Sequence, residues 1–219
     1  MIELTKNEKQ WENAFNTLEK RVYSADLVNG YDFWKDLGKY ISFDSKILDY
    51  GCGKGLLVTK LLKKGYKNTF GTDPSKVFLN DLLHDNSNLR LMDSSTIPFP
   101  DSTFDVVYCS GVLHHIAWDN LINVMNEVNR VLKCGGVFIY AEPRLTIIRR
   151  FGHLLVFSPL NMISKGVKNL KDCLLAEWPT YYPWLKKEPE FLDVLAKTNF
   201  KEINKREKIM TVIGTYEKL

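Results

Sequence analysis

The run Ile47-Leu48-Asp49-Tyr50-Gly51-Cys52-Gly53-Lys54-Gly55 decides the fold of this chain. An apolar stretch leads into three glycines at alternate positions, and helix-forming residues follow them. The pattern is typical of a buried strand that turns sharply into a helix, because glycine tolerates backbone conformations that other residues avoid. Ligands of open parallel sheets bind outside the carboxyl ends of the strands, so this turn predicts a site where backbone approaches a ligand closely.

Short apolar runs alternate with helical stretches around this turn, a pattern that favours an α/β fold with a parallel sheet. The predicted strands cover residues 46–50, 68–72, 89–92, 104–109 and 136–142. The predicted helices between them cover residues 54–64, 75–84 and 118–133. We expect the Gly135-Gly136 pair to end the last of these helices as a C-terminal cap.

The flanking segments complete one domain of 219 residues. At the N-terminus, helices are predicted at 7–22, where Trp11, Phe15 and Leu18 share a face, and at 32–41. At the other end we expect a helix over 188–198 and a hairpin of strands 200–208 and 209–217. The predicted parts are an N-terminal helical cap (1–45), a core (46–143), an insertion (144–187) and a terminal helix and hairpin (188–219).

Composition predicts an ordinary folded protein, with 45% hydrophobic and 26% charged residues. Residues 1–10 are polar and lack the start of a secretory signal, so we expect a cytoplasmic location. The four cysteines lie too far apart for a metal site or a redox motif, and we expect reduced thiols and no bound metal.

Two carboxylates follow the next two predicted strands. Asp73, before Pro74, comes 20 residues after Gly53, at the spacing where an acidic side chain accepts bonds from ribose hydroxyls. Asp93 ends the third strand and could accept a hydrogen bond from the exocyclic amine of an adenine. Asp49 could orient the glycine turn or attract an ammonium group, although each of these acids could also be a simple turn residue. Together they predict recognition of an adenosine.

These residues resemble the class I S-adenosylmethionine-dependent methyltransferase family over about Lys46 to Pro143. The resemblance implies a Rossmann-like, doubly wound, seven-stranded, mainly parallel sheet, with the last strand antiparallel and helices on both faces. It implies S-adenosyl-L-methionine as cofactor and S-adenosyl-L-homocysteine as product. The implied cofactor-binding residues are Asp49, Gly51, Cys52, Gly53, Asp73, Pro74, Asp93, Ser94 and Ser110. The runs Ile97–Asp101, Phe104–Val107 and Leu113–His115 are similar to a subgroup that acts on small molecules.

Other cofactors fit less well. A nicotinamide dehydrogenase needs a third glycine where this chain has Leu56, and no Gly-Lys-Ser/Thr element of a nucleoside triphosphatase follows the turn. A non-catalytic subunit that binds S-adenosylmethionine to regulate a partner would keep the same glycines and Asp73, so this alternative stays open.

His114 and His115 follow the fourth strand at the ligand edge of the sheet. Histidine titrates near neutral pH, so either suits a general base that takes a proton from a hydroxyl or amine acceptor. Of the two, we expect His115 to face the acceptor. The alternative is that one histidine packs or hydrogen-bonds in the loop and the other only lines the cofactor site.

The insertion is expected to roof the acceptor site without regular structure over most of its length. Within it, an amphipathic helix presents Ile147, Ile148, Phe151, Leu154 and Leu155, which could pack on the domain, form a lid or touch a membrane. Aromatic residues follow over 177–184, where Pro179 and Pro183 are expected to hold an extended course.

The insertion also carries eight Lys or Arg against two acids, which predicts contact with anionic groups. The resemblance favours a small-molecule acceptor, such as a sugar or glycolipid of surface polysaccharide synthesis, with peripheral contact to a membrane or lipid-linked substrate. An RNA acceptor is the alternative, and we expect no nucleic-acid partner because no recognition module is visible. The oligomeric state stays open. At the N-terminus Tyr23, Tyr31 and Trp34 either close over the cofactor or pack as an ordinary helix pair.

Overall fold

The protein is described from a computed structural model. The structure describes residues 33–76, 79, 87–93, 96–159 and 165–219. The predicted helix 7–22, residues Tyr23 and Tyr31, most of the predicted helix 75–84 and Ser94 lie outside the described residues.

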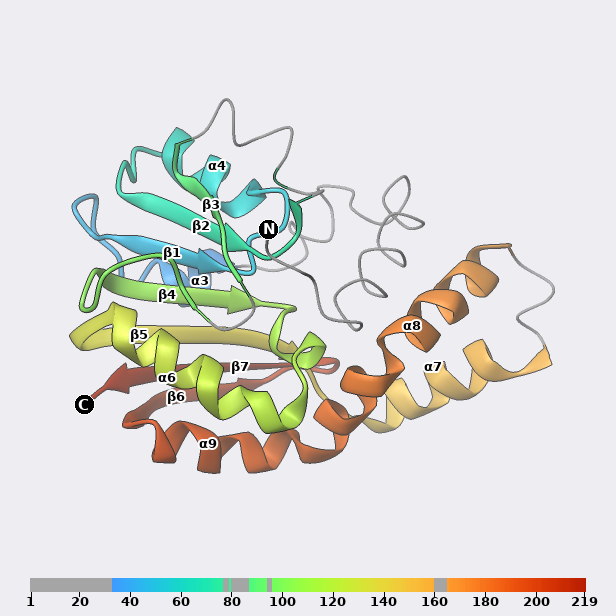
Figure 1. Ribbon diagram of the computed structural model, residues 1–219. Coiled ribbons are helices and arrows are strands. Elements are labelled where there is room, and N and C mark those ends of the chain that lie inside the picture. Colours follow the sequence, from blue (N-terminus) through green and yellow to red (C-terminus); the bar gives the residue numbers. More distant parts are fainter. Residues whose placement is uncertain (1–32, 77–78, 80–86, 94–95, 160–164) are drawn as a thin grey trace.

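A seven-stranded sheet forms the centre of the molecule (Figure 1). Its strands are β1 (Ile47–Tyr50), β2 (Thr69–Asp73), β3 (Leu89–Leu91), β4 (Phe104–Ser110), β5 (Leu132–Pro143), β6 (Phe200–Glu207) and β7 (Thr211–Lys218). The order is β3-β2-β1-β4-β5-β7-β6, and β7 runs antiparallel to both of its neighbours while the pairs from β3 to β5 are parallel. This arrangement confirms the predicted fold class. The chain crosses over between β1 and β4, so the glycine turn after β1 lies at the point where the strand order reverses.

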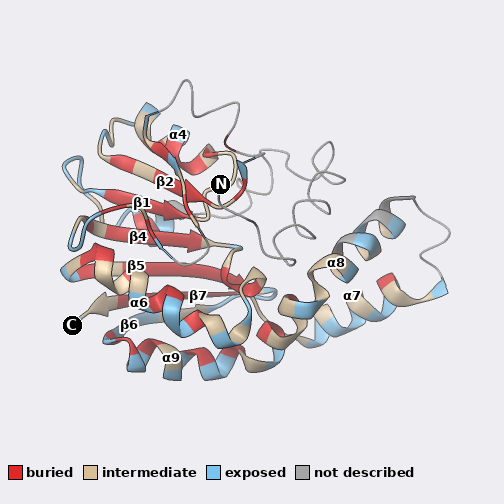
Figure 2. Cartoon of the chain, in the orientation of Figure 1, coloured by how far each residue is buried: buried red, intermediate tan, exposed pale blue. Residues whose placement is uncertain are grey.

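The described helices lie partly on the two faces of this sheet and partly in an arm that extends away from it (Figure 1). They are α3 (Phe33–Leu37), α4 (Leu56–Lys63), α6 (Leu121–Val131), α7 (Ile147–Phe157), α8 (Lys165–Lys187) and α9 (Phe191–Lys197), with short 3-10 turns η1 (Leu113–His115), η2 (Trp118–Asn120) and η4 (Glu188–Glu190). Successive strand residues point to opposite faces. Leu48 and Tyr50 therefore pack with α6 and α9, whereas Ile47 packs with α3 and α4. Both layers are buried (Figure 2).

The expectation that Gly135 and Gly136 cap a helix is wrong. Helix α6 ends at Val131, and Leu132 is already extended and pairs with Phe104 of β4. The next pair joins Val106 to Val137, so the four residues between Leu132 and Val137 bulge out of the ladder. Gly135 takes a left-handed φ of 73°, as expected of glycine, but it serves this bulge and not a helix end.

The insertion is helical, which corrects the expected irregular segment and its extended course. Pro179 and Pro183 lie inside α8. A proline inside a helix removes a hydrogen bond and clashes with the preceding turn, so sequence alone argues against a helix here. The compensation is burial: Tyr181, Trp184 and Leu185 follow helical spacing and are at most 3% exposed in the main core.

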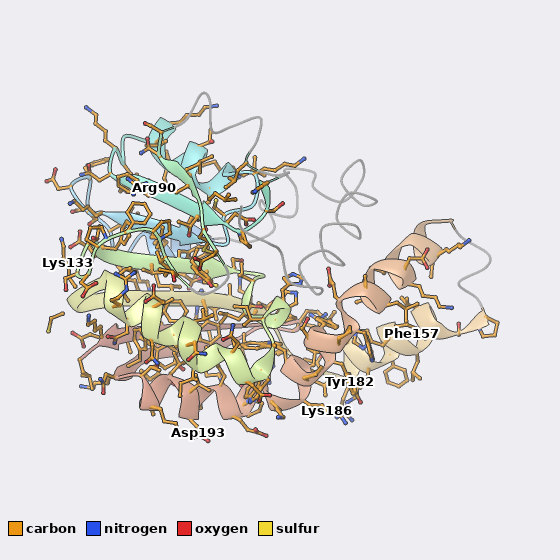
Figure 3. All side chains as sticks on the ribbon, in the orientation of Figure 1. Arg90, Lys133, Phe157, Tyr182, Lys186 and Asp193 are labelled. Atoms are coloured by element: carbon orange, nitrogen blue, oxygen red, sulfur yellow. The ribbon has the colours of Figure 1, made fainter. Side chains whose placement is uncertain are left out.

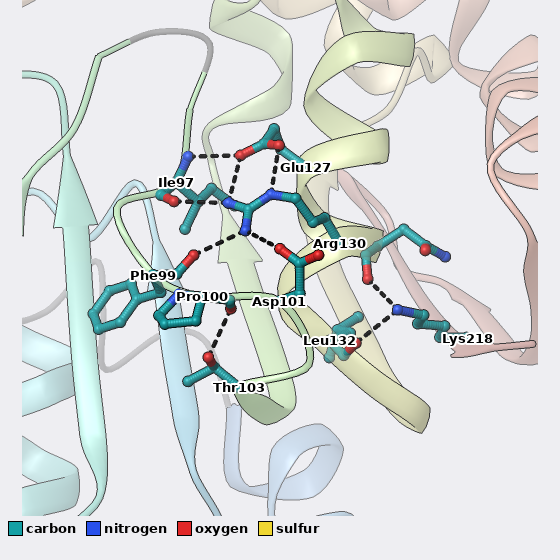
Figure 4. A network of polar contacts seen from close by, with 10 residues as sticks. Ile97, Phe99, Pro100, Asp101, Thr103, Glu127, Arg130, Leu132 and Lys218 are labelled. Atoms are coloured by element: carbon teal, nitrogen blue, oxygen red, sulfur yellow. Dashed lines mark hydrogen bonds and ion pairs between the residues drawn. The ribbon is translucent and has the colours of Figure 1, made fainter.

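The segment between β3 and β4 is anchored to α6 by Arg130 (Figure 4). Its guanidinium donates to the carbonyl oxygens of Ile97 and Phe99, to Asp101 and to both oxygens of Glu127, all between 2.7 and 2.9 Å. Glu127 in turn accepts the backbone N–H of Ile97 at 2.9 Å. The run Ile97–Asp101, identified in the sequence by resemblance, therefore has a structural role in holding the segment that follows β3.

Candidate functional site

The glycine turn has the backbone that the sequence pattern requires. Gly51, Gly53 and Gly55 all have positive φ, between 52° and 72°. A Cβ at Gly51 would lie 2.3 Å from a methyl group of Val112, so the loop after β4 packs directly against the turn. At Gly53, by contrast, no described atom lies within 4 Å of the position of a Cβ. The turn is closed on the side of β4 and open at Gly53, where a ligand could meet the backbone.

Asp73 holds the turn in place from the neighbouring strand. One carboxylate oxygen accepts the backbone N–H of Gly53 at 2.8 Å, and the other accepts that of Ser75 at 2.9 Å. The side chain is buried, which orients both oxygens. An ionised carboxylate offers about four acceptor positions, so these two bonds are compatible with the predicted role of Asp73 in accepting ribose hydroxyls. The predicted site residue therefore also shapes the loop.

Asp49 is a carboxylate buried in the central strand of the sheet. Burial, and after it repulsion from Asp73, raises the pKa of Asp49 to about 7. A buried acid without a matching cation costs stability, and groups with such strongly shifted pKa values gather at functional sites. An ammonium group of a bound cofactor would supply the missing positive charge. The open backbone at Gly53 and the buried charge at Asp49 fit a cofactor that carries a ribose and an amino acid.

The remaining predicted cofactor residues lie at the same edge of the sheet. Asp93 is half-buried and accepts the backbone N–H of Thr96 at 2.6 Å. Ser110 ends β4 and is half-buried, and Pro74 is half-buried directly after Asp73. Cys52 is half-buried, and burial raises the pKa of its thiol well above the ordinary value. The side chain of Cys52 packs against Gly71 of β2, so it holds the glycine turn against this neighbouring strand.

His114 is fixed by a buried carboxylate that the sequence analysis missed. Its Nδ1 lies 2.6 Å from one oxygen of Glu142, a side chain with no exposed surface. The other oxygen of Glu142 accepts the backbone N–H groups of Val112 and Leu113, both at 2.8 Å. Because Val112 also lies against Gly51, the loop that carries this histidine adjoins the glycine turn. An acid within the apolar strand residues 137–143 was the signal that could have revealed Glu142.

His115 and Glu177 complete a cluster around His114. The two histidine rings lie 4.0 Å apart, and ligand atoms of His114, His115 and Glu177 all lie within 4.8 Å of one another. Burial, and then the charge of His114, lowers the pKa of His115 well below its ordinary value. Burial raises the pKa of Glu177, an effect that His114 partly offsets. Tyr181 of α8 adds an edge-on ring 5.5 Å from His114. The structure thus brings the insertion to the two predicted histidines.

The fold, with the family match that follows, shows a class I S-adenosylmethionine-dependent methyltransferase domain in this chain. Residues 48–140 match the family model described as a methyltransferase domain. This match covers the glycine turn, the predicted site acids Asp49, Asp73 and Asp93, and the two histidines.

Curated relatives share this part of the chain. A tRNA U34 carboxymethyltransferase from Nautilia profundicola is 30% identical over 113 residues, which are 48% of this chain and 37% of that protein. An eEF1A lysine and N-terminal methyltransferase from Xenopus laevis is 32% identical over 143 residues, 59% of this chain and 20% of that protein. The chain therefore spans well under half the length of these relatives.

A solved structure shares the fold over nearly the whole chain. It is an S-adenosylmethionine-dependent methyltransferase from Aquifex aeolicus, with a TM-score of 0.63 over 94% of this chain and 98% of that one. The sequence identity is 15%, so this likeness bears on the fold alone.

Proposed function

We propose that this chain methylates a hydroxyl or amine of a small molecule, a sugar or lipid-linked sugar by preference, with S-adenosylmethionine as donor. When bound, this donor supplies an electrophilic methyl group whose bond to sulfur breaks as the acceptor's lone pair forms the new bond. The observation that carries the proposal is the imidazole of His114, fixed by buried Glu142 beside the glycine turn.

His114 would take the proton that the acceptor loses. The carboxylate of Glu142 accepts from Nδ1–H, which leaves Nε2 as the basic ring nitrogen. When Nε2 gains a proton, the adjacent carboxylate stabilises the imidazolium, as it does in other histidine and carboxylate pairs. His115 suits this role less, because its lowered pKa makes it a weak base. We therefore favour His114 over His115, which sequence reasoning preferred.

The acceptor side is formed by α8, which contacts η1 directly. Glu177 and Tyr181 stand next to His114, where burial raises the pKa of Glu177 and either side chain could hydrogen-bond to an acceptor. Covering the base in this way excludes water, which strengthens polar interactions during the reaction. A cover so close to the base supports a small or flexible acceptor more than a large folded one.

Other acceptors follow from the relatives, whose names refer to a tRNA and to the protein eEF1A. A non-catalytic cofactor-binding subunit is a further alternative.

We place the reaction in the cytoplasm, in keeping with the free thiols of Cys52, Cys109 and Cys134.

One experiment separates these acceptors. The purified chain is incubated with methyl-labelled S-adenosylmethionine and a cell extract, and the label is measured in organic-soluble, water-soluble, nuclease-sensitive and protease-sensitive fractions. We expect label in the organic-soluble or small water-soluble fraction. Label that disappears on nuclease or protease treatment would contradict the proposal, and calorimetric binding of S-adenosylhomocysteine without any transfer would favour the regulatory subunit.

His114→Ala tests the proposed base in the same assay. We expect label transfer to fall by roughly 10²- to 10⁴-fold, the usual contribution of a general base, with unchanged affinity for S-adenosylhomocysteine. Asp73→Ala is the matched variant for the cofactor side, because it removes the carboxylate that holds Gly53 and should weaken binding. Unchanged transfer by His114→Ala would remove the base role.

A further inference from the structure

Helix α7 presents an apolar face to solvent. Five large side chains on it are between 58% and 72% exposed: Ile147, Ile148, Phe151, Leu154 and Leu155. They recur at the spacing of one helical face, and Figure 2 shows exposed surface along this helix. This outcome contradicts the reading in which the face packs against the domain. A contiguous apolar face of this kind marks an interaction surface.

The opposite side of α7 is already used for folding. Val156 is buried, and His153 and Phe157 pack edge-on against Trp178 of α8, with ring centres 5.4 and 5.1 Å away (Figure 3). Helices α7 and α8 form an arm that extends away from the sheet (Figure 1). Because the packed side fixes how α7 is turned, its apolar face points away from α8 and is held in a set orientation.

Positive charge borders this apolar face. Arg150 is exposed next to it on α7. Elsewhere on the arm, α8 carries exposed Lys168, partly exposed Lys171 and, directly after it, the acid Asp172. The other acid of the insertion, Glu177, lies inward at the histidine cluster. Leu170 and Leu175 of α8 are also exposed, so the arm carries further apolar side chains in solvent. An apolar helix face edged with cations matches an anionic lipid surface, where side chains enter the hydrocarbon boundary and cations meet headgroups.

We infer that the arm docks the protein on an anionic bilayer through the apolar face of α7. Docking would be peripheral, since within the described part of the chain no helix combines the length and apolar character needed to cross a membrane. Arg149 hydrogen-bonds to Tyr181, which lies beside His114, so the arm is connected to the proposed acceptor site. Supply of a lipid-linked acceptor from the bilayer rests on the proposed function, whereas docking itself does not.

Vesicle flotation of the full chain tests the docking without any methyl transfer. The probes are vesicles of phosphatidylcholine alone and of phosphatidylcholine mixed with phosphatidylglycerol. We expect binding to the anionic vesicles that weakens in high salt, because screening reduces the attraction of exposed cations. Phe151→Ser/Leu154→Ser should lower this binding by at least about tenfold, since it removes apolar groups that enter the lipid boundary.

The chain offers a closely matched control. Phe43 and Leu219 are 63% and 66% exposed, the same values as Phe151 and Leu154, and they lie outside the arm. Phe43→Ser/Leu219→Ser should bind vesicles like the unchanged protein. Equal losses in both double variants, or no flotation of the unchanged protein, would overturn the inference. Light scattering adds a separate outcome: a dimer that becomes a monomer in Phe151→Ser/Leu154→Ser would assign the face to a second copy of the chain. Retained binding of S-adenosylhomocysteine shows that the variants are folded.

Discussion

Two carboxylates buried in the strands on either side of β4 distinguish this site at the scale of single residues. Asp49 in β1 lies near the glycine turn and Asp73, and Glu142 in β5 lies against His114 and the loop after β4. Burying either group is costly unless it is paired or performs a function. Glu142 accepts from two backbone N–H groups and pairs with the imidazole, whereas burial and the charge of Asp73 raise the pKa of Asp49 to about 7. The two acids therefore lead to different predictions.

Replacing Glu142 with Gln should reverse the tautomer of His114. The carbonyl oxygen of Gln can keep accepting from Val112 and Leu113 only if its NH₂ group faces Nδ1. Nδ1 must then accept, and the proton moves to Nε2, which can no longer act as a base. We expect label transfer to fall by roughly 10²- to 10⁴-fold with unchanged affinity for S-adenosylhomocysteine. If Glu142→Gln instead lost both transfer and cofactor affinity, the carboxylate would be a structural support of the site.

Asp49 makes cofactor affinity depend on pH. The pKa of Asp49 in the folded protein is raised to about 7, so the protonated carboxyl favours the folded state. Its contribution to the free energy of unfolding is complete below the ordinary carboxyl pKa near 4 and is lost as pH rises through about 7. A ligand ammonium favours the ionised form, so affinity for S-adenosylhomocysteine should rise over the same range. We expect calorimetry to show binding that tightens by up to about tenfold per pH unit below pH 7 and then levels off.

Asp49→Asn should remove this pH dependence and weaken binding at about pH 8, where the wild-type carboxylate is ionised. Asp193→Asn, an exposed acid on α9, serves as the control and should leave the curve as it is in the unchanged protein. A pH dependence that persists in Asp49→Asn would assign it to another group.

At the scale of elements, connections decide where the site residues stand. Sequence patterns predicted the parallel strands and the helices beside them, since their apolar spacing is local. The patterns gave a wrong prediction after α6, where Gly135 lies in a bulge of β5 and not at a helix end. They were also wrong in α8, where burial of Tyr181 and Trp184 stabilises a helix that contains two prolines. In both places the deciding energy comes from contacts that are distant in sequence. The Arg130 network is a third such contact, and it can be tested by stability.

Arg130→Ala should lower the free energy of unfolding by roughly 2 to 3 kcal/mol, because it leaves Glu127 and two backbone carbonyls without their guanidinium partner. Urea unfolding followed by circular dichroism measures this change. Lys133→Ala is the matched control, since it removes one ion pair to Asp105. The side chains of Lys133 and Asp105 are 44% and 34% exposed, so losing the pair should lower the free energy of unfolding by less than about 1 kcal/mol. Similar costs for the two variants would mean that the network adds nothing beyond a surface pair.

At the scale of the whole molecule, the antiparallel strand β7 lies between β5 and β6 and pairs along β5, which carries Glu142. The fit is tight at Gly214, where an added Cβ would lie 2.4 Å from the ring of Tyr140 and 2.7 Å from that of Tyr216. Both rings are buried and cannot move away easily.

Gly214→Ala should therefore destabilise the fold by roughly 1 to 3 kcal/mol through overpacking. Gly152→Ala on α7 is the opposite case, because no described atom lies within 4 Å of the added Cβ. It should be neutral or stabilise by up to about 1 kcal/mol, as alanine favours a helix over glycine. Thermal unfolding of both variants checks the pair, and a neutral Gly214→Ala would show that the β5 and β7 contact adapts.

The amino-acid sequence by itself determined the order of strands and helices, the glycine turn and the strand-end acids Asp73 and Asp93, because each depends on neighbours close in the chain. Only the tertiary structure decided that Glu142 selects His114, that α8 brings Glu177 to the same place, and that α7 leaves its apolar face in solvent. These features join β5, η1 and the insertion, because residues 114, 142 and 177 lie 28 to 63 positions apart in the sequence. Pairing and burial over such separations follow from how the elements pack, which periodicity along the chain does not encode.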